Sequence, residues 1–345
     1  MRRKIYIGWF FVALAAMSCA REDVAPDGGD KIAFYVKTQQ AVSASSRALI
    51  EDTDDLLSIN KRPPLYVTGE GADNLANTPV GYTANGVWQS DEEWKNGQEY
   101  TFYAYIASPL QTATSTQGGV SNISNNGKTL TLQQPTSYSS DENVWADYLL
   151  SYRVSANGSN KGLVKLDLER VTACVELYMA RSEKVGAVNI TGITFKDVVT
   201  KATFGISYHA VPKDEEGLYG MKNSWIVTPD ETSKTAYTFN PTSPLETYTE
   251  SDDRFDVKYR QMRFLTIPQT LIDGATLSVS YTVDENGTTA SYQSEFTLSD
   301  YTPRAWYRGH KIRYFIGIDT SIKLEGFIEP WKSVDYIETT LLPKD

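Results

Sequence analysis

The stretch GLVKLDLERVTACVELYM, residues 162–179, decides the fold of this chain. In its first half every second residue is apolar and charged residues lie between, which is the alternation of a half-buried β-strand. After Glu169 the apolar positions shift by one, to Val171 and every second residue beyond it. Because a shift of one residue exchanges the two faces of a strand, we expect a bulge or turn near Glu169 and Arg170.

Strand patterns of the same kind recur along the chain, separated by turn signals. TLSVSYTV (276–283) alternates throughout, YTFYAYIA (100–107) is rich in aromatic residues, and IRYFIGI (312–318) with IKLEGFI (322–328) has the pattern of a closing hairpin. Five Asn-Gly pairs supply the positive φ angles that tight hairpin turns require. Many short strands joined by turns predict an all-β sandwich fold. The helical pieces that we expect are short, such as SDEEWKNG with Ser90 as an N-cap.

The N-terminus has the pattern of an export signal. Basic residues at positions 2–4 precede an apolar run of 13 residues, whereas a helix that crosses the hydrocarbon core of a bilayer needs about 20. Small residues precede Cys19, as at a bacterial lipoprotein processing site, although Ala16 stands where the usual motif has leucine. We expect residues 1–18 to be a signal peptide and Cys19 to be the lipidated N-terminus, which would carry palmitate. An ordinary signal peptide cut elsewhere and an uncleaved short anchor are the alternatives.

The next segment and the length of the chain suggest the domain organisation. Residues 19–30 are polar, contain a proline and a glycine pair, and should form a tether. Glu22 and Asp23 resemble the acidic signal that sends lipoproteins of gut and oral Gram-negative anaerobes to the outer face of the outer membrane. A chain of 345 residues suggests two domains more readily than one, and we place them at residues 31–181 and 182–345. The boundary could lie about twenty residues earlier.

The charge of the chain excludes one class of partner. The net charge is −10, and removal of residues 1–18 deletes three basic and no acidic residues, which gives −13. An acidic chain without a basic stripe is poorly suited to phosphate backbones, so we expect no nucleic-acid partner. If Cys19 carries lipid, Cys174 has no partner for a disulfide and should be a small buried residue of a strand.

The residues that catalysis or metal binding would need are sparse. The two histidines, His209 and His310, lack the spacing of shared metal ligands, and no G-x-S-x-G motif is present. Acidic clusters such as residues 51–55 and 91–94 could pair carboxylates for glycoside hydrolysis or bind calcium. In an acidic chain such clusters are more typical of solvated loops. We therefore expect no enzyme, no metal and no cofactor, since a hydrolase would need two carboxylates that converge in a cleft.

Several segments, taken in order, resemble the fimbrillin family, which comprises the lipoprotein-derived subunits of type V pili and their relatives. The segments are VWQSDEEWKNGQEYTFYAYIASP (87–109), DYLLSYRV (147–154) with GLVKLDLERVTACVELYM, MRFLTIPQTLIDGATLSVSYTV (262–283), and WYRGHKIRYFIGI (306–318) with FIEPW (327–331). The third segment contains an Ile-Pro-Gln motif at residues 267–269, and Glu169 stands where family members often have histidine. With the lipoprotein start, these segments cover most of the chain.

The resemblance implies a fold and a way of assembly. The fold is two tandem transthyretin-like β-sandwich domains. Subunits of the family are exported as lipoproteins, and an Arg-specific protease then cuts near the N-terminus and removes the first strand. A strand of a neighbouring subunit fills the open sheet edge by donor-strand exchange, and head-to-tail repetition of that contact builds a filament.

The N-terminal part of this chain offers two candidates for that assembly. KIAFYVK (31–37) is the candidate removable strand, with Ile32, Phe34 and Val36 on one face. Arg47, in the polar segment that follows, is the candidate cleavage site, because exposed loops are the usual sites of proteolysis. The alternative is that Arg47 is a solvated loop residue and that the strand stays in place, as in an anchor or a relative that does not polymerise.

The C-terminal segment 332–345 is the candidate donor strand, with Val334 and Tyr336 in alternation, or else an ordinary closing strand and tail. The resemblance thus implies a surface-exposed pilus subunit, or a tip or anchor component, held in the outer membrane by its lipid. Its partners would be other pilus subunits and a host or bacterial surface ligand, to which it adheres. A glycan-binding lipoprotein of a nutrient-uptake system is the alternative, which exposed coplanar Trp or Tyr rings on a loop rim would favour.

Overall fold

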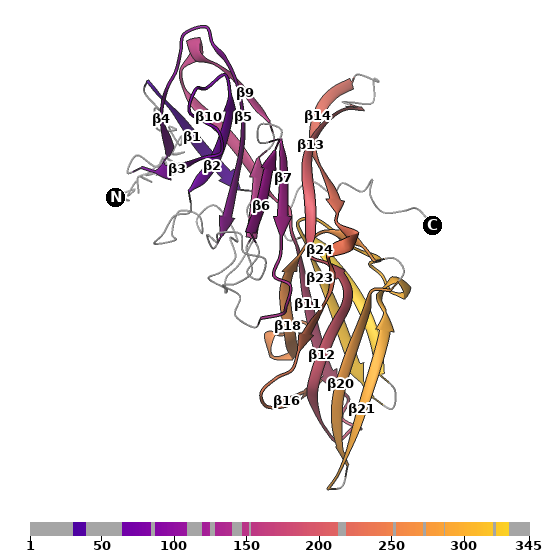
Figure 1. Cartoon of the computed structure of the whole chain (residues 1–345). Helices are drawn as coiled ribbons and strands as arrows, with labels where there is room; N and C mark the ends of the chain where they lie inside the picture. The colour runs from indigo at the N-terminus through magenta and orange to yellow at the C-terminus, as the bar shows by residue number, and fades with distance from the viewer. Residues whose placement is uncertain are drawn as a thin grey trace, which may run out of the picture.

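The computed structural model describes residues 30–38, 64–83, 87–108, 119–124, 128–139, 147–151, 153–212, 219–250, 253–271, 274–285, 287–319 and 322–330. Across them the chain is built from β-strands (Figure 1), with short 3-10 turns at Gly158–Asn160, Glu231–Ser233, Val257–Tyr259 and Leu298–Asp300. Among these residues no helix has the length and apolar character needed to cross a membrane. The all-β class is confirmed, whereas the transthyretin-like domain type and the signal peptide stay predictions.

The first half of the chain forms a large sheet, here the N-terminal sheet, that closes on itself (upper part of Figure 1). Its eight strands, in spatial order, are β2 (Leu65–Glu70), β3 (Thr78–Tyr82), β4 (Trp88–Glu93), β1 (Lys31–Thr38), β10 (Leu163–Arg170), β8 (Asp147–Ser151), β5 (Glu99–Ser108) and β9 (Val154–Asn157). A further pairing joins β2 to β5, so the sheet curls until its first strand meets that strand. Its inward side chains, Trp88 and Phe102 among them, form one buried cluster, the N-terminal core.

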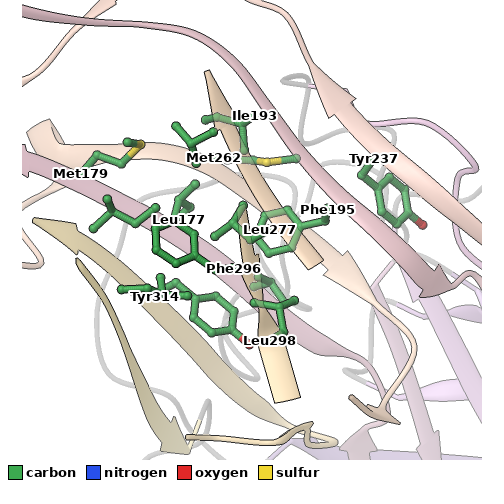
Figure 2. Packing of buried hydrophobic residues seen from close by; sticks show 14 of the residues in the cluster. Leu177, Met179, Ile193, Phe195, Tyr237, Met262, Leu277, Phe296, Leu298 and Tyr314 are labelled. Carbon is green, nitrogen blue, oxygen red and sulfur yellow. The ribbon is translucent and has the colours of Figure 1, made fainter. Parts of the chain in front are cut away.

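Two five-stranded sheets, here the C-terminal sheets, enclose a second buried cluster, the C-terminal core. The first contains β17 (Tyr248–Thr249), β11 (Ala173–Arg181), β23 (His310–Ile318), β24 (Ile322–Pro330) and β18 (Arg260–Thr266). The second contains β15 (Lys234–Phe239), β12 (Ala187–Val199), β20 (Thr276–Glu285), β21 (Thr288–Thr297) and β16 (Leu245–Glu246). Figure 2 shows side chains of both sheets, such as Leu177 and Tyr314 of the first and Phe195 and Leu277 of the second, packed together in this core.

A four-stranded sheet, here the central sheet, joins the two halves. Its strands, in spatial order, are β14 (Tyr219–Pro229), β13 (Lys201–Pro212), β7 (Thr129–Gln133) and β6 (Gly119–Ser124). Strands β7 and β13 are far apart in the sequence but lie side by side where the halves meet (Figure 1). The remaining pair of strands, β19 (Gln269–Thr270) and β22 (Ala305–Trp306), forms a short ladder of its own.

The stretch 162–179 passes from one half to the other. Strand β10 ends at Arg170 and β11 begins at Ala173, which confirms the break expected where the apolar phase shifts. Strand β10 pairs within the N-terminal sheet, while β11 pairs with β18 and β23 of the C-terminal sheets. The pairing therefore changes ahead of the boundary that we place after residue 181. That the two halves are separate domains stays a prediction.

Two strand predictions are confirmed in detail. The closing hairpin exists, because β23 and β24 pair antiparallel from His310 and Pro330 to Ile318 and Ile322. The alternation predicted for TLSVSYTV (276–283) is also confirmed, in strand β20. The buried residues of that strand's inner face are Leu277, Val279, Tyr281 and Val283.

The short helix expected in SDEEWKNG is wrong. Ser90 lies inside β4, where the residues at positions 88, 90 and 92 are buried and those between are more exposed. Strand β4 has β1 on one side and β3 on the other, and these backbone partners outweigh the local capping tendency of serine. The hydroxyl that would cap a helix donates instead to the carbonyl oxygen of Ile32 at 2.9 Å.

Candidate functional site

Strand β1 occupies a central position in the N-terminal sheet. On one side it pairs parallel with β10, from Ala33 opposite Leu163 to Thr38 opposite Leu168. On the other side it pairs antiparallel with β4, with Phe34 opposite Trp88. The strand that comes first in the sequence is therefore an interior strand, and both of its backbone edges are used.

The inward face of β1 is part of the N-terminal core. The residues expected on that face, Ile32, Phe34 and Val36, are exposed by 0%, 0% and 2%. The ring of Phe34 meets that of Phe102 edge to face, with centroids 5.3 Å apart. Burial of such side chains contributes about 1.5–3 kcal/mol each, so β1 is held chiefly by its apolar face.

Polar contacts hold the N-terminal end of β1 more weakly. Lys31 pairs with Asp91 at 3.0 Å, and Lys161 pairs with Asp30 at 2.6 Å, and all four side chains are well exposed. The hydrogen bond and the charge of Lys161 lower the pKa of Asp30. Exposed ion pairs of this kind contribute little to stability because water and salt screen them.

The other predicted assembly residues lie outside the described residues. These are the lipidation residue Cys19, the candidate cleavage residue Arg47, and the candidate donor residues Val334 and Tyr336. Their roles stay predictions. Cys174 lies in β11 as expected, where it is a free and fully buried thiol, and burial raises its pKa to about 11.

Among the described residues, no three His, Cys, Asp or Glu side chains are grouped as they would be in a metal site. Of the carboxylates in the described part of the chain, that of Glu176 is the most buried, and sequence reasoning did not single it out. Strand β11 places it in register between Arg263 of β18 and Arg313 of β23. The carboxylate lies 3.3 Å from Nε of Arg263 and 3.1 Å from Nε of Arg313. Arg260 is 3.5 Å away.

The environment of Glu176 keeps it ionised. Burial acts to raise its pKa, but the attraction of Arg263 and Arg313 and a 2.8 Å hydrogen bond from the Tyr178 hydroxyl together lower it. A carboxylate saturated by arginines is suited to fixing three neighbouring strands in register rather than to proton transfer. The ordinary alternation of the strand hides such a residue, because its partners come from strands that are distant in the sequence.

Exposed aromatic rings, which could bind sugars, are scattered over the described part of the chain. Tyr248 of β17 is 52% exposed and Tyr292 of β21 is 49% exposed, and they belong to different C-terminal sheets. Tyr248 meets Tyr259 at an interplanar angle of 70°, while Tyr292 stacks on Tyr281, which is buried. Neither arrangement is the pair of exposed coplanar rings that the glycan-binding alternative requires.

Comparisons with known proteins bear on the family. The fimbrillin-like family model matches residues 23–331. A fimbrial protein from Bacteroides vulgatus is similar in structure, with 15% identity, a TM-score of 0.50, and 87% of this chain and 99% of that chain covered. A candidate cell adhesion protein from Parabacteroides distasonis has 11% identity and a TM-score of 0.46, with 90% and 99% covered. None of the curated proteins matches this chain by sequence.

The family match spans most of the chain, and the likeness to the Bacteroides vulgatus protein shows a shared fold. The family match confirms the resemblance that the sequence indicates. This chain belongs to the fimbrillin-like family.

Proposed function

We propose that this protein is a surface-exposed lipoprotein that acts as a structural pilus subunit, or as a tip or anchor component, and assembles by donor-strand exchange at the position of β1. Membership in the fimbrillin-like family supports a fimbrial role. The observation that carries the proposal is the place of β1 between β4 and β10, with its apolar face buried.

Removal of β1 would create an acceptor site with defined chemistry. The facing backbone groups of β4 and β10 would lose their partners, and the core surface under Ile32, Phe34 and Val36 would meet water. Unpaired edges and exposed apolar surface are both unfavourable, so a strand with alternate apolar residues is the ligand that satisfies them. A neighbour that supplies such a strand makes a head-to-tail contact, and contacts of this type propagate into filaments.

The remaining steps of the proposal concern segments outside the described residues. Cys19 carries the lipid that anchors the precursor in the outer membrane, and cleavage after Arg47 detaches β1 together with the lipidated Cys19. The segment with Val334 and Tyr336 is the donor strand for the next subunit. Other pilus subunits are then the partners, and the protein resides in the fimbrium on the cell surface, where it mediates adhesion to a host or bacterial ligand.

The proposed role needs no catalytic chemistry, because strand exchange forms and breaks only non-covalent contacts. The proteins similar in structure are described as a fimbrial protein and a candidate cell adhesion protein, which agrees with a structural rather than an enzymatic role. The glycan-binding alternative lacks a specific observation in its favour among the described residues.

The test is mild solubilisation of native surface material, electrophoresis without boiling, and sequencing of the mature N-terminus. A polymerising subunit gives a ladder of high-mass bands that collapses on boiling, and its N-terminus begins at Ala48. A single monomer band with residues 31–37 still attached would overturn both maturation and strand exchange.

A further inference from the structure

We infer that the central sheet fastens the two halves into a single cooperative folding unit. Two excursions build it. The chain leaves the N-terminal sheet after β5 and returns to it at β8, and these two strands pair with each other. It likewise leaves the second C-terminal sheet after β12 and returns at β15, which pairs with β12. The two excursions meet where β7 pairs with β13.

The meeting of β7 and β13 is a regular antiparallel ladder. It runs from Gln133 opposite Lys201 to Thr129 opposite Gly205. The ladder is extended by a 2.7 Å bond from the N–H of Gln134 to the carbonyl of Thr200. Backbone pairing of this kind fixes both position and register, which an ordinary side-chain contact between two halves would not do.

A buried cluster, here the central core, lies under that ladder. The N-terminal half contributes Tyr105, Tyr148 and Leu150 from its sheet and Leu130 and Leu132 from β7. The C-terminal half contributes the following buried residues: Ala202 and Phe204 from β13, and Ile267. Each of these side chains is at most 7% exposed, so the central core is as deeply buried as the core of a domain.

The segment after β7 carries the contact further into the C-terminal half. The buried hydroxyl of Tyr237 in β15 donates to the carbonyl of Pro135 at 2.7 Å. The ring of Tyr138 lies 5.1 Å from that of Phe239, also in β15, and packs against the C-terminal core. The segment after β7, which belongs to the first half, therefore packs against β15 and the core of the second half.

These contacts couple the stability of the halves. Contacts between domains of one chain are commonly polar and allow relative motion. Here, separation would break a ladder, expose the central core and leave buried carbonyls without partners, which is unfavourable on every count. A substitution that promotes unfolding of one half should therefore promote unfolding of the other half as well.

Hydrogen exchange measured by mass spectrometry tests the coupling with one truncation in each core. Leu166→Ala lies in the N-terminal core and Leu277→Ala in the C-terminal core, and both leucines are fully buried. Each substitution should raise the opening constant of the slowest amides by roughly a hundredfold. The increase should be the same for amides of β10 and of β20. An increase confined to the half that carries the substitution would overturn the inference.

A second pair of variants locates the coupling. Phe204→Ala combined with Tyr237→Phe weakens the fastening, so that Leu166→Ala then changes the exchange of β10 alone. Phe296→Ala, in the C-terminal core away from the central sheet, is the matched control and should leave the coupling intact.

The hydroxyls of Thr131 and Thr203 lie 3.4 Å apart across β7 and β13, so a Thr131→Cys, Thr203→Cys disulfide should restore the coupling in the weakened protein. If coupling persists in the weakened protein without the disulfide, the central sheet is not its source. Should the weakened protein fail to fold, the two leucine variants decide alone.

Discussion

The side chain of Gln269 is hydrogen-bonded to both backbone groups of Val199. Its Oε1 accepts from the Val199 N–H at 2.8 Å, and its Nε2 donates to the Val199 carbonyl at 3.1 Å. Val199 is the last residue of β12, immediately before the chain enters the central sheet. Gln269, the glutamine of the Ile-Pro-Gln motif, therefore fixes the end of β12, where the chain passes from the second C-terminal sheet into the central sheet.

Replacement of this glutamine tests its importance. Gln269→Leu keeps the size of the side chain but leaves the N–H and carbonyl of Val199 unpaired in a buried place, which should lower the free energy of unfolding by about 2 kcal/mol. Urea denaturation measures the change. Thr289→Leu, on an exposed stretch of β21, is the control and should shift the free energy by less than about 0.5 kcal/mol. Equal effects of the two substitutions would contradict the role given to Gln269.

Truncation of the strand that we propose to be exchanged should be severe. Phe34→Ala removes a fully buried ring from the N-terminal core, and such changes lower the free energy of unfolding by about 3–5 kcal/mol. Tyr35→Ala, on the half-buried opposite face of β1, should have a smaller effect. Denaturation of both variants in parallel checks the difference, and a mild effect of Phe34→Ala would show that β1 is not anchored by its apolar face.

The buried carboxylate of Glu176 gives a pH dependence with a defined sign. Since folding lowers its pKa below the ordinary 4.5, the group stabilises the folded protein above about pH 4.5, and that contribution disappears as the pH falls through its lowered value. Glu176→Gln leaves the surrounding arginines uncompensated and should lower the free energy of unfolding by about 3 kcal/mol at pH 7.

Denaturation curves of wild type and Glu176→Gln, recorded between pH 7 and pH 3, should therefore converge at the acid end. Glu295→Gln is the control, because the pair of Glu295 with Lys196 is half exposed and its loss should change the free energy by less than about 1 kcal/mol. A difference for Glu176→Gln that stays constant with pH would contradict the assignment.

Lipidation has a direct test. Cys19→Ala removes the thiol that would receive the lipid, so the protein should no longer incorporate labelled palmitate and should leave the outer-membrane fraction. Cys174→Ala, at the buried thiol, is the control and should change neither property. Retention of Cys19→Ala in the outer membrane would mean that something other than lipid anchors the chain.

Maturation is tested at the candidate cleavage residue. Arg47→Ala should retain residues 31–37 on the surface protein and abolish the high-mass ladder, because β1 then stays in its own sheet. Arg47→Lys separates the requirement for arginine from a requirement for positive charge, and an Arg-specific protease should leave it uncut. Ladders of unchanged intensity in Arg47→Ala would rule out maturation at this residue.

The sequence predicted local structure well where alternation alone determined it. The break after Glu169, the inner face of β20 and the closing hairpin all follow from periodicity within one segment, and the structure confirms them. The prediction of a helix that begins at Ser90 is wrong for the opposite reason. The conformation of this segment is set by pairing with β1 and β3, which lie outside it in the sequence.

Contacts between distant segments could not be predicted. Glu176 looks like an exposed strand residue until register brings Arg263 and Arg313 beside it. The central sheet was missed as well, because β7 and β13 come from different halves and neither strand carries a signal of its partner. The inward face of β1 was recovered because its apolar residues alternate within one short segment, whereas its placement between β4 and β10 required the structure.

The parallel pairing of β1 with β10 also bears on how the protein is made. The N-terminus emerges first during synthesis, yet Ala33 has its partner in Leu163. One edge of β1 therefore stays unpaired until most of the first half has been synthesised. During that interval the growing chain exposes an unpaired edge of β1 itself, which is the counterpart of the slot between β4 and β10 that removal of β1 would open.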